Sequence, residues 1–129
     1  MARVLIIEDD PSLLDSLRDL LTLAQLECSV AASAEQGLAI FKADGASLVV
    51  CDVQLPDMTG YQVCQLLKRD GPSKDIPVVL MSGRFTESED IVQGIELGAS
   101  DFFTKPFDPR FFIARLKSLL RPPPAALQN

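Results

Sequence analysis

The sequence predicts a doubly wound α/β sandwich, in which helices cover both faces of a five-stranded parallel sheet. Five short apolar or β-branched runs recur along the chain, and an amphipathic stretch of about ten to fifteen residues follows each of them. This alternation favours right-handed βαβ units and a parallel sheet, whose ligands bind beyond the carboxyl ends of the strands. The expected strands are residues 4–7, 28–31, 48–51, 77–81 and 101–104.

The amphipathic stretches begin and end at residues that are typical of helix termini. Asp10 is a cap before Pro11 at the first helical position, and Ser33 with Gln36 forms a capping box. The other expected boundaries are Gly71-Pro72 after the third helix, a capping box of Thr86 and Glu89 before the fourth, Gly98 after it, and Asp108-Pro109 before the fifth. The expected buried faces are Leu13, Leu14, Leu17, Leu20, Leu21 and Ala24; Leu38, Ile40 and Phe41; Val63, Leu66 and Leu67; Ile91, Val92 and Ile95; and Phe112, Ile113, Leu116, Leu119 and Leu120.

Length and composition are those of one ordinary globular domain. Of the 129 residues, 47% are hydrophobic and 23% charged, and the apolar runs are far shorter than the roughly 20 residues of a membrane-spanning helix. The net charge of −6 argues against a basic patch for nucleic-acid phosphates. We therefore expect a cytoplasmic domain over residues 1–121 that by itself binds neither membrane nor nucleic acid. Residues 122–129, which begin with three prolines, are expected to be a tail or a truncated linker.

Histidine and cysteine usage restricts the chemistry that is available. The chain has no histidine, which removes the commonest general base and every Ser-His or Cys-His catalytic pair. Its cysteines, Cys28, Cys51 and Cys64, are odd in number, form no CxxC pair and have apolar neighbours, so we expect them to be reduced and buried. Chemistry in this protein must use carboxylates, hydroxyls and amines.

The first expected strand ends in three consecutive carboxylates, Glu8, Asp9 and Asp10. Like charges about 4 Å apart repel by roughly 4 kcal/mol at an effective dielectric constant near 20, so something must offset this repulsion. Asp10 is explained as the cap of the first helix, which leaves Glu8 and Asp9. Carboxylate oxygens without sulfur or imidazole suit a hard cation, and we expect Mg²⁺ or Mn²⁺.

Polar side chains also follow the third, fourth and fifth strands: Asp52, Ser82 and Lys105. Parallel strands present their carboxyl ends at one edge, so these groups are expected to converge on the acidic cluster. A phosphoryl group needs a cation and a hydroxyl donor around its oxygens, and this set predicts a site for a phosphoryl group bridged to a metal. Asp52 stands alone at its strand end, where it could act as a nucleophile that forms an aspartyl phosphate.

The motifs together resemble the receiver domain of bacterial two-component response regulators, over residues 3–121. The resembling segments are LIIEDDP, VVCDVQLPDMTGYQV, VVLMSGR and GASDFFTKPF. The resemblance implies a flavodoxin-like sheet of strand order 2-1-3-4-5. It also implies a signalling domain that accepts a phosphoryl group on Asp52 from a sensor histidine kinase or a phosphotransfer protein. Such a domain catalyses only its own phosphorylation and dephosphorylation and is not a conventional enzyme.

The resemblance further implies roles for individual residues and partners. The metal is held by three carboxylates and a main-chain carbonyl: Glu8, Asp9, Asp52 and the carbonyl of Gln54. Ser82 and Lys105 contact the phosphoryl oxygens, and the Lys105-Pro106 bond is cis. Ser82 and Phe102 form a switch that reshapes the face of the fourth helix, fifth strand and fifth helix, a face that would also serve a homodimer. The output is an effector domain beyond residue 121 or a separate target protein.

Other functions fit the sequence less well. An aspartate-nucleophile phosphohydrolase needs a second acid two residues after Asp52, where this chain has Gln54. A Rossmann nucleotide-binding domain needs a glycine-rich loop where this chain has EDDP. A receiver-like interaction module that is never phosphorylated is the main alternative, and the presence of every required side chain argues against it. Asp57, in the LPDMTG loop, is interpreted as a loop or capping acid.

Overall fold

The computed structural model describes residues 3–69, 71, 73–83 and 88–121, and within them strands and helices alternate as expected. The strands are β1 (Arg3–Ile7), β2 (Glu27–Ala31), β3 (Leu48–Asp52), β4 (Val78–Ser82) and β5 (Asp101–Thr104). The helices are α1 (Pro11–Leu23), α2 (Ala34–Asp44), α3 (Gly60–Arg69), α4 (Ser88–Glu96) and α5 (Pro109–Leu120). All strand pairs are parallel, in the order β2-β1-β3-β4-β5. The predicted fold and strand order are confirmed.

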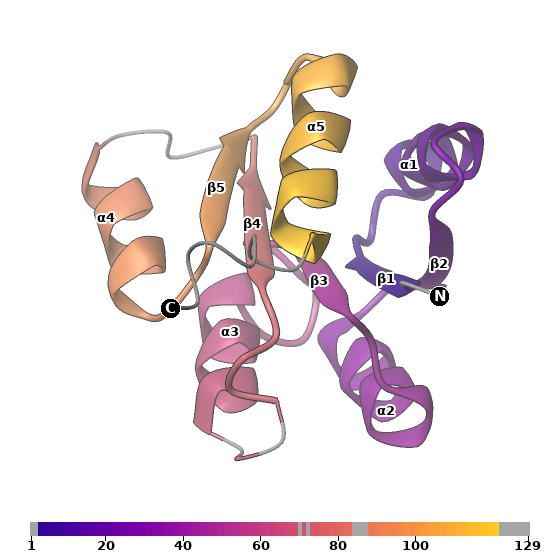
Figure 1. Ribbon diagram of the computed structural model, residues 1–129. Helices are drawn as coiled ribbons and strands as arrows, with labels where there is room; N and C mark the ends of the chain where they lie inside the picture. Colours follow the sequence, from indigo (N-terminus) through magenta and orange to yellow (C-terminus); the bar gives the residue numbers. More distant parts are fainter. Residues whose placement is uncertain (1–2, 70, 72, 84–87, 122–129) are drawn as a thin grey trace, which may run out of the picture.

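Two apolar layers hold the helices against the sheet (Figure 1). Helices α1 and α5 cover one face, and α2, α3 and α4 cover the other. Because side chains alternate along a strand, Val4 and Ile6 of β1 contribute to the α1/α5 layer, whereas Leu5 and Ile7 contribute to the opposite layer. A strand that is buried on both faces has no polar alternation, which explains the uninterrupted apolar run before Glu8.

The predicted helix starts that lie in the described residues are confirmed by their hydrogen bonds. Asp10 Oδ1 accepts from the N–H of Ser12 (3.0 Å), and Ser33 Oγ accepts from the N–H of Gln36 (3.1 Å). Beyond α4, Gly98 adopts φ +102°, a conformation that favours glycine. At α5, Asp108 Oδ1 accepts from the N–H of Arg110 (2.9 Å). Pro72 and the side chains of the Thr86–Glu89 capping box lie outside the described residues.

The helical faces are buried less completely than the sequence predicts. The fully buried members are Leu17, Leu21, Val63, Leu67, Phe112 and Leu116, and most of the others are partly buried. Val92 and Ile95 are 51% and 48% exposed, because α4 packs beside the edge strand β5 and only part of its apolar face meets the sheet. Leu66 of α3 is 37% exposed.

In α2 the fully buried residues are Ala34 and Gly37, not the predicted Leu38, Ile40 and Phe41, which are partly buried. A Cβ at Gly37 would lie 2.7 Å from Cγ1 of Ile7. The missing side chain therefore lets the backbone of α2 lie close to β1, and the larger side chains pack against the core layer while they stay partly exposed.

All three cysteines are free thiols, as predicted. Cys51 and Cys64 are buried, whereas Cys28 is only partly buried because β2 is an edge strand. Burial raises the pKa of the Cys51 thiol well above its usual value, and nearby Asp52 adds to this effect. Among the described helices, none combines the length and the apolar character needed to span a bilayer.

Candidate functional site

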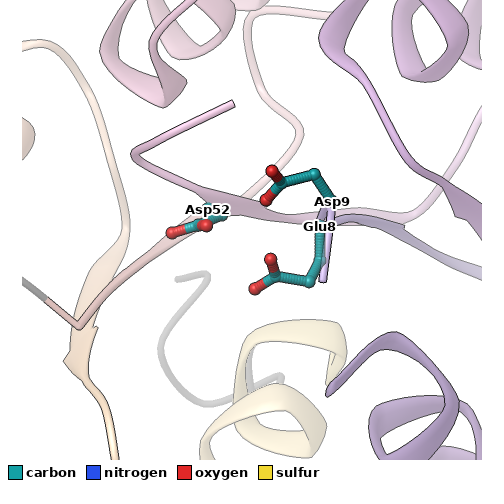
Figure 2. Close-up of side chains that lie close together, drawn as sticks. All are labelled: Glu8, Asp9 and Asp52. Carbon is teal, nitrogen blue, oxygen red and sulfur yellow. The ribbon is translucent and has the colours of Figure 1, made fainter. Parts of the chain in front are cut away.

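The carboxyl ends of β1 and β3 bring three carboxylates together (Figure 2). Ile7 of β1 pairs with Cys51 of β3. The residues that follow them, Glu8 and Asp52, therefore lie side by side at the carboxyl edge of the sheet. One carboxylate oxygen from each of Glu8, Asp9 and Asp52 lies within 4.8 Å of the other two. Glu8 and Asp52 are buried, whereas Asp9 is exposed. The predicted convergence of the acidic residues is confirmed.

Asp10 takes no part in this cluster. Its side chain caps α1, as predicted, and its N–H donates to Oε2 of Glu8 (3.1 Å). The N–H of Glu8 donates in turn to the carbonyl of Ala31 (3.0 Å), which ties the end of β1 to β2. These contacts fix the Glu8 carboxylate beside the end of β3.

Lys105 brings a positive charge to the two buried carboxylates. Its Nζ lies 2.6 Å from Oε1 of Glu8 and 3.5 Å from Oδ2 of Asp52. Its N–H donates to the carbonyl of Ser82 (2.8 Å), so the backbone pairing of β4 with β5 continues to Lys105. The Lys105-Pro106 peptide bond is cis, as the resemblance implies. The predicted proximity of Lys105 to the acidic cluster is confirmed.

Ser82 ends β4, whereas Phe102 lies within β5, two residues before the end of that strand. Ser82 is buried at the end of β4, which neighbours β3 and therefore Asp52. Phe102 is partly buried in the layer under α4, where a Cβ on Gly94 would lie 3.1 Å from its ring. Gly94 thus leaves room for the Phe102 ring between β5 and α4.

The loop after Asp52 is closed at its base. Gly60 N–H donates to the carbonyl of Val53 (2.7 Å), and Gln54 pairs with Thr59 as an isolated bridge. A Cβ at Gly60 would lie 2.9 Å from Cα of Val53 and would also clash with the carbonyl oxygen of Asp52. Glycine is therefore required at this position, because the first turn of α3 lies directly against the backbone of Asp52.

The site holds two carboxylates, those of Glu8 and Asp52, that are buried. Burial raises the pKa of Glu8. The hydrogen bond from Lys105 lowers it and the charge of Asp52 raises it, and the net result is a raised pKa. Burial also raises the pKa of Asp52, although the Lys105 charge opposes it. Burial lowers the pKa of Lys105, but its hydrogen bond to Glu8 and the charge of Asp52 outweigh this and raise it overall. A single ammonium thus offsets only part of the carboxylate repulsion.

In the absence of divalent cations, these shifts predict that Asp52 makes the domain less stable as pH rises. A carboxyl whose pKa is higher in the folded than in the unfolded state binds more protons when folded, so the free energy of unfolding falls as pH passes upward through this range. Urea unfolding in EDTA from about pH 4 to pH 7 should show Asp52→Asn gaining stability relative to wild type.

Wild type is compared with Asp52→Asn, and not judged alone, because other carboxyl groups also change stability with pH. Backbone N–H donors lower the pKa values of Asp57 and Asp108, so these two groups make the domain more stable as pH rises. Their contribution is the same in both proteins and cancels in the difference. A wild-type protein that gains stability over Asp52→Asn as pH rises would contradict the proposed charge balance.

The donor set fits a hard divalent cation. Three carboxylates supply only oxygen ligands, which Mg²⁺ prefers. Opposite ligands of Mg²⁺, at 2.0–2.1 Å from the ion, lie about 4 Å apart. Adjacent ligands lie about 3 Å apart, and at most one pair among three ligands can be opposite, so the carboxylate oxygens, which lie within 4.8 Å of one another, would move closer together around one ion. These residues could therefore hold a metal ion with small side-chain adjustments.

One contact of this region was not expected from the sequence. Asp57 is a capping acid, as interpreted, but it caps α2, which begins 23 residues earlier in the chain. Its Oδ1 accepts from the N–H of Ala34 (3.0 Å) and its Oδ2 from the N–H of Glu35 (2.7 Å). No local pattern identifies a cap whose helix lies so far away in sequence, because the contact depends on tertiary packing.

The fold and the site together define a doubly wound α/β protein with a cluster of carboxylates that could hold a cation at the carboxyl edge of its sheet. Residues 4–117 match the model of the response regulator receiver domain. The chain belongs to this family and is a receiver domain of two-component signal transduction.

Individual relatives agree with this assignment. The sensory transduction protein RegX3 of Mycolicibacterium smegmatis is 40% identical over 121 residues, which are 94% of this chain and 51% of the relative. A response regulator receiver domain protein of Methanospirillum hungatei has a TM-score of 0.85 at 29% identity, with 93% of this chain and 94% of that chain covered. The receiver domain of a signal transduction histidine kinase from Syntrophus aciditrophicus has a TM-score of 0.85 at 28% identity, with 93% and 90% covered. The chain spans about half the length of the curated relatives it matches.

Proposed function

We propose that Asp52 is the phosphoacceptor of this receiver domain and that its donor is a phosphohistidine of a sensor histidine kinase or a phosphotransfer protein. The observation that carries the proposal is the convergence of the Glu8, Asp9 and Asp52 carboxylates with the Lys105 ammonium. Asp52 ends β3, the central strand, so groups from β1 lie on one side of it and groups that follow β4 and β5 lie on the other. This central position suits the atom to which a phosphoryl group becomes attached.

The metal ligands in this proposal are the carboxylates of Glu8, Asp9 and Asp52 and the main-chain carbonyl of Gln54. When bound, Mg²⁺ or Mn²⁺ neutralises charge on the phosphoryl oxygens. The carboxylate oxygen of Asp52 forms a bond to phosphorus while the bond from phosphorus to the imidazole nitrogen breaks and leaves its electron pair on the imidazole. Lys105 and the Ser82 hydroxyl then donate hydrogen bonds to the transferred group.

The domain would also hydrolyse its own aspartyl phosphate by attack of water, so it acts as a switch and not as a conventional turnover enzyme. Ser82 and Phe102 are proposed to couple the site to the surface of α4, β5 and α5. A hydrogen bond from Ser82 to the phosphoryl group draws the end of β4 toward Asp52, and the partly buried Phe102 responds on the neighbouring strand. The reshaped α4, β5 and α5 surface is the proposed contact for targets and for a homodimer.

The proposed setting is the cytoplasm, with residues 1–121 acting as the receiver and residues 122–129 as a tail or linker. The matched relatives are about twice as long, and one of them is the DNA-binding dual master transcriptional regulator RpaA of Synechocystis. This supports output through an effector domain or a separate target protein. The receiver itself is proposed to bind neither nucleic acid nor membrane.

A small phosphodonor tests the proposal without knowledge of the kinase. The protein should incorporate close to one phosphoryl group per chain from acetyl phosphate with Mg²⁺, measured by intact mass spectrometry, and almost none in EDTA. Equal incorporation in both conditions would contradict the proposed metal-dependent site.

Asp9→Asn is expected to weaken Mg²⁺ binding at least about tenfold, which corresponds to about 1.4 kcal/mol of binding free energy. Asp9 is exposed, so its replacement should leave the fold intact while it removes one charged ligand. Calorimetric titration with Mg²⁺ measures the affinity, and Asp44→Asn, which removes an exposed carboxylate at the far end of α2, is the control. Equal affinities for the two variants would exclude Asp9 as a ligand.

A further inference from the structure

The loop from Val53 to Gly60 joins β3 to α3 and carries the carbonyl of Gln54. Its base is closed by its own backbone, through the hydrogen bond from Gly60 to Val53 and the bridge between Gln54 and Thr59. Its tip is fixed by a contact to another part of the fold. There, Asp57 reaches the first turn of α2, and each of its two carboxylate oxygens accepts from a different backbone N–H.

Helix α2 already has a cap of its own. Ser33 Oγ accepts from the N–H of Gln36, and Gln36 Oε1 accepts from the N–H of Ala32 (2.9 Å). The two N–H groups that donate to Asp57 precede the N–H of Gln36, which donates to Ser33. They carry the partial positive charge of a helix N-terminus, which attracts a carboxylate. Since α2 can start without Asp57, this contact matters chiefly for the loop.

The contact also connects the segments that carry the metal ligands. Helix α2 lies directly against β1, where Gly37 leaves room for Ile7, and Glu8 is the next residue of the chain. A loop that is tied to α2 is therefore tied to the end of β1. Asp57 thus joins the segment of Gln54 and Asp52 to the segment of Glu8 and Asp9, although its own side chain lies outside the carboxylate cluster.

We propose that Asp57 is a positioning residue for the metal site, which fixes the carbonyl of Gln54 relative to the carboxylates by tying the loop tip to α2. This inference rests on the proposed function, because it takes the Gln54 carbonyl as a metal ligand. Mg²⁺ demands near-ideal octahedral geometry, so a mobile carbonyl ligand costs affinity.

The expected effect is moderate because the loop has other contacts. Leu55 and Met58 are partly buried against the core layer under α2 and α3. Loss of a group that orients a metal ligand typically reduces metal affinity about 10- to 100-fold. We therefore expect Asp57→Ala to weaken Mg²⁺ binding about tenfold, at the lower end of this range, and to slow phosphorylation by acetyl phosphate at a fixed Mg²⁺ concentration.

Three further variants separate a positioning role of Asp57 from a general loss of negative charge or of helix stability. Asp57→Asn removes the charge but keeps one carboxamide oxygen as an acceptor, so its affinity should lie between those of wild type and Asp57→Ala. Ser33→Ala removes the separate cap of α2 and should lower stability without a change in Mg²⁺ affinity. Glu35→Gln removes a neighbouring exposed charge but keeps the backbone N–H that binds Asp57.

Calorimetric Mg²⁺ titration of the full chain, with circular dichroism to verify folding, distinguishes the outcomes. The inference predicts reduced affinity in Asp57→Ala, a smaller reduction in Asp57→Asn, and wild-type affinity in Ser33→Ala and Glu35→Gln. Wild-type affinity in Asp57→Ala, or an equal loss in Ser33→Ala or Glu35→Gln, overturns the inference alone. Failure of the wild-type protein to bind Mg²⁺ overturns the proposed function instead.

Discussion

Asp52→Asn is expected to abolish phosphorylation by acetyl phosphate in the presence of Mg²⁺. The amide of asparagine lacks the anionic oxygen that attacks phosphorus. The substitution also removes one of the three carboxylates that could hold the cation. The variant should still fold, because burial opposes ionisation of Asp52 and an uncharged amide avoids this effect, while Glu8 no longer faces the charge of Asp52. Intact mass spectrometry should show labelling at background, with stability at pH 7 in EDTA at or above that of wild type.

A matched variant controls for a general effect of removing a carboxylate. Asp19→Asn makes the same chemical change on the exposed surface of α1 and should be labelled like wild type. Wild-type labelling of Asp52→Asn would show that another residue accepts the phosphoryl group.

Gly60→Ala is expected to lower both the stability of the domain and its affinity for Mg²⁺. The new Cβ would meet the backbone of Asp52 and Val53, which cannot rotate away as the end of a long side chain can. Overpacking of this kind typically costs about 1–3 kcal/mol. Alanine is otherwise about 1 kcal/mol better than glycine within a helix, so a net loss would show that the backbone contact dominates.

The measurements are urea unfolding and calorimetric Mg²⁺ titration. Gly71→Ala is the matched control, because a Cβ there meets nothing within 4 Å. Its free energy of unfolding should change by no more than about 0.5 kcal/mol and its Mg²⁺ affinity should be unaffected. If Gly60→Ala were as stable as Gly71→Ala, α3 would not lie as close to the end of β3 as the structure indicates.

The fold could be predicted because the apolar runs and helix caps in the sequence agree with the strands and helices of the structure. Each predicted strand boundary lies within one residue of the observed one. The reason is clearest for β1, β3 and β4, which are buried on both faces and therefore form continuous apolar runs. Burial of the helices was predicted less well, because periodicity identifies an apolar face but not how closely it meets the sheet. The small residue Gly37 sets that distance for α2, and an edge position exposes Val92 and Ile95 in α4.

The predicted carboxylates and Lys105 could be located because each lies within two residues of the end of a parallel strand, and all parallel strands end at the same edge. The contacts that orient them were not predictable in this way. Asp57 binds a helix that begins 23 residues before it, and Gly60 is required by the backbone of a neighbouring segment. Both contacts join segments that are brought together by tertiary packing, so no local sequence pattern identifies them.

The most direct test of the central claim, that Asp52 is the phosphoacceptor, locates the phosphoryl group itself. The wild-type protein is phosphorylated with acetyl phosphate and Mg²⁺ and then treated with borohydride, which reduces an aspartyl phosphate to homoserine. Peptide mass spectrometry identifies the reduced residue. Homoserine at position 52, absent when EDTA replaces Mg²⁺, is the predicted result. Homoserine at another carboxylate, or a stable phosphate on a hydroxyl with Asp52 unchanged, would contradict the proposed mechanism.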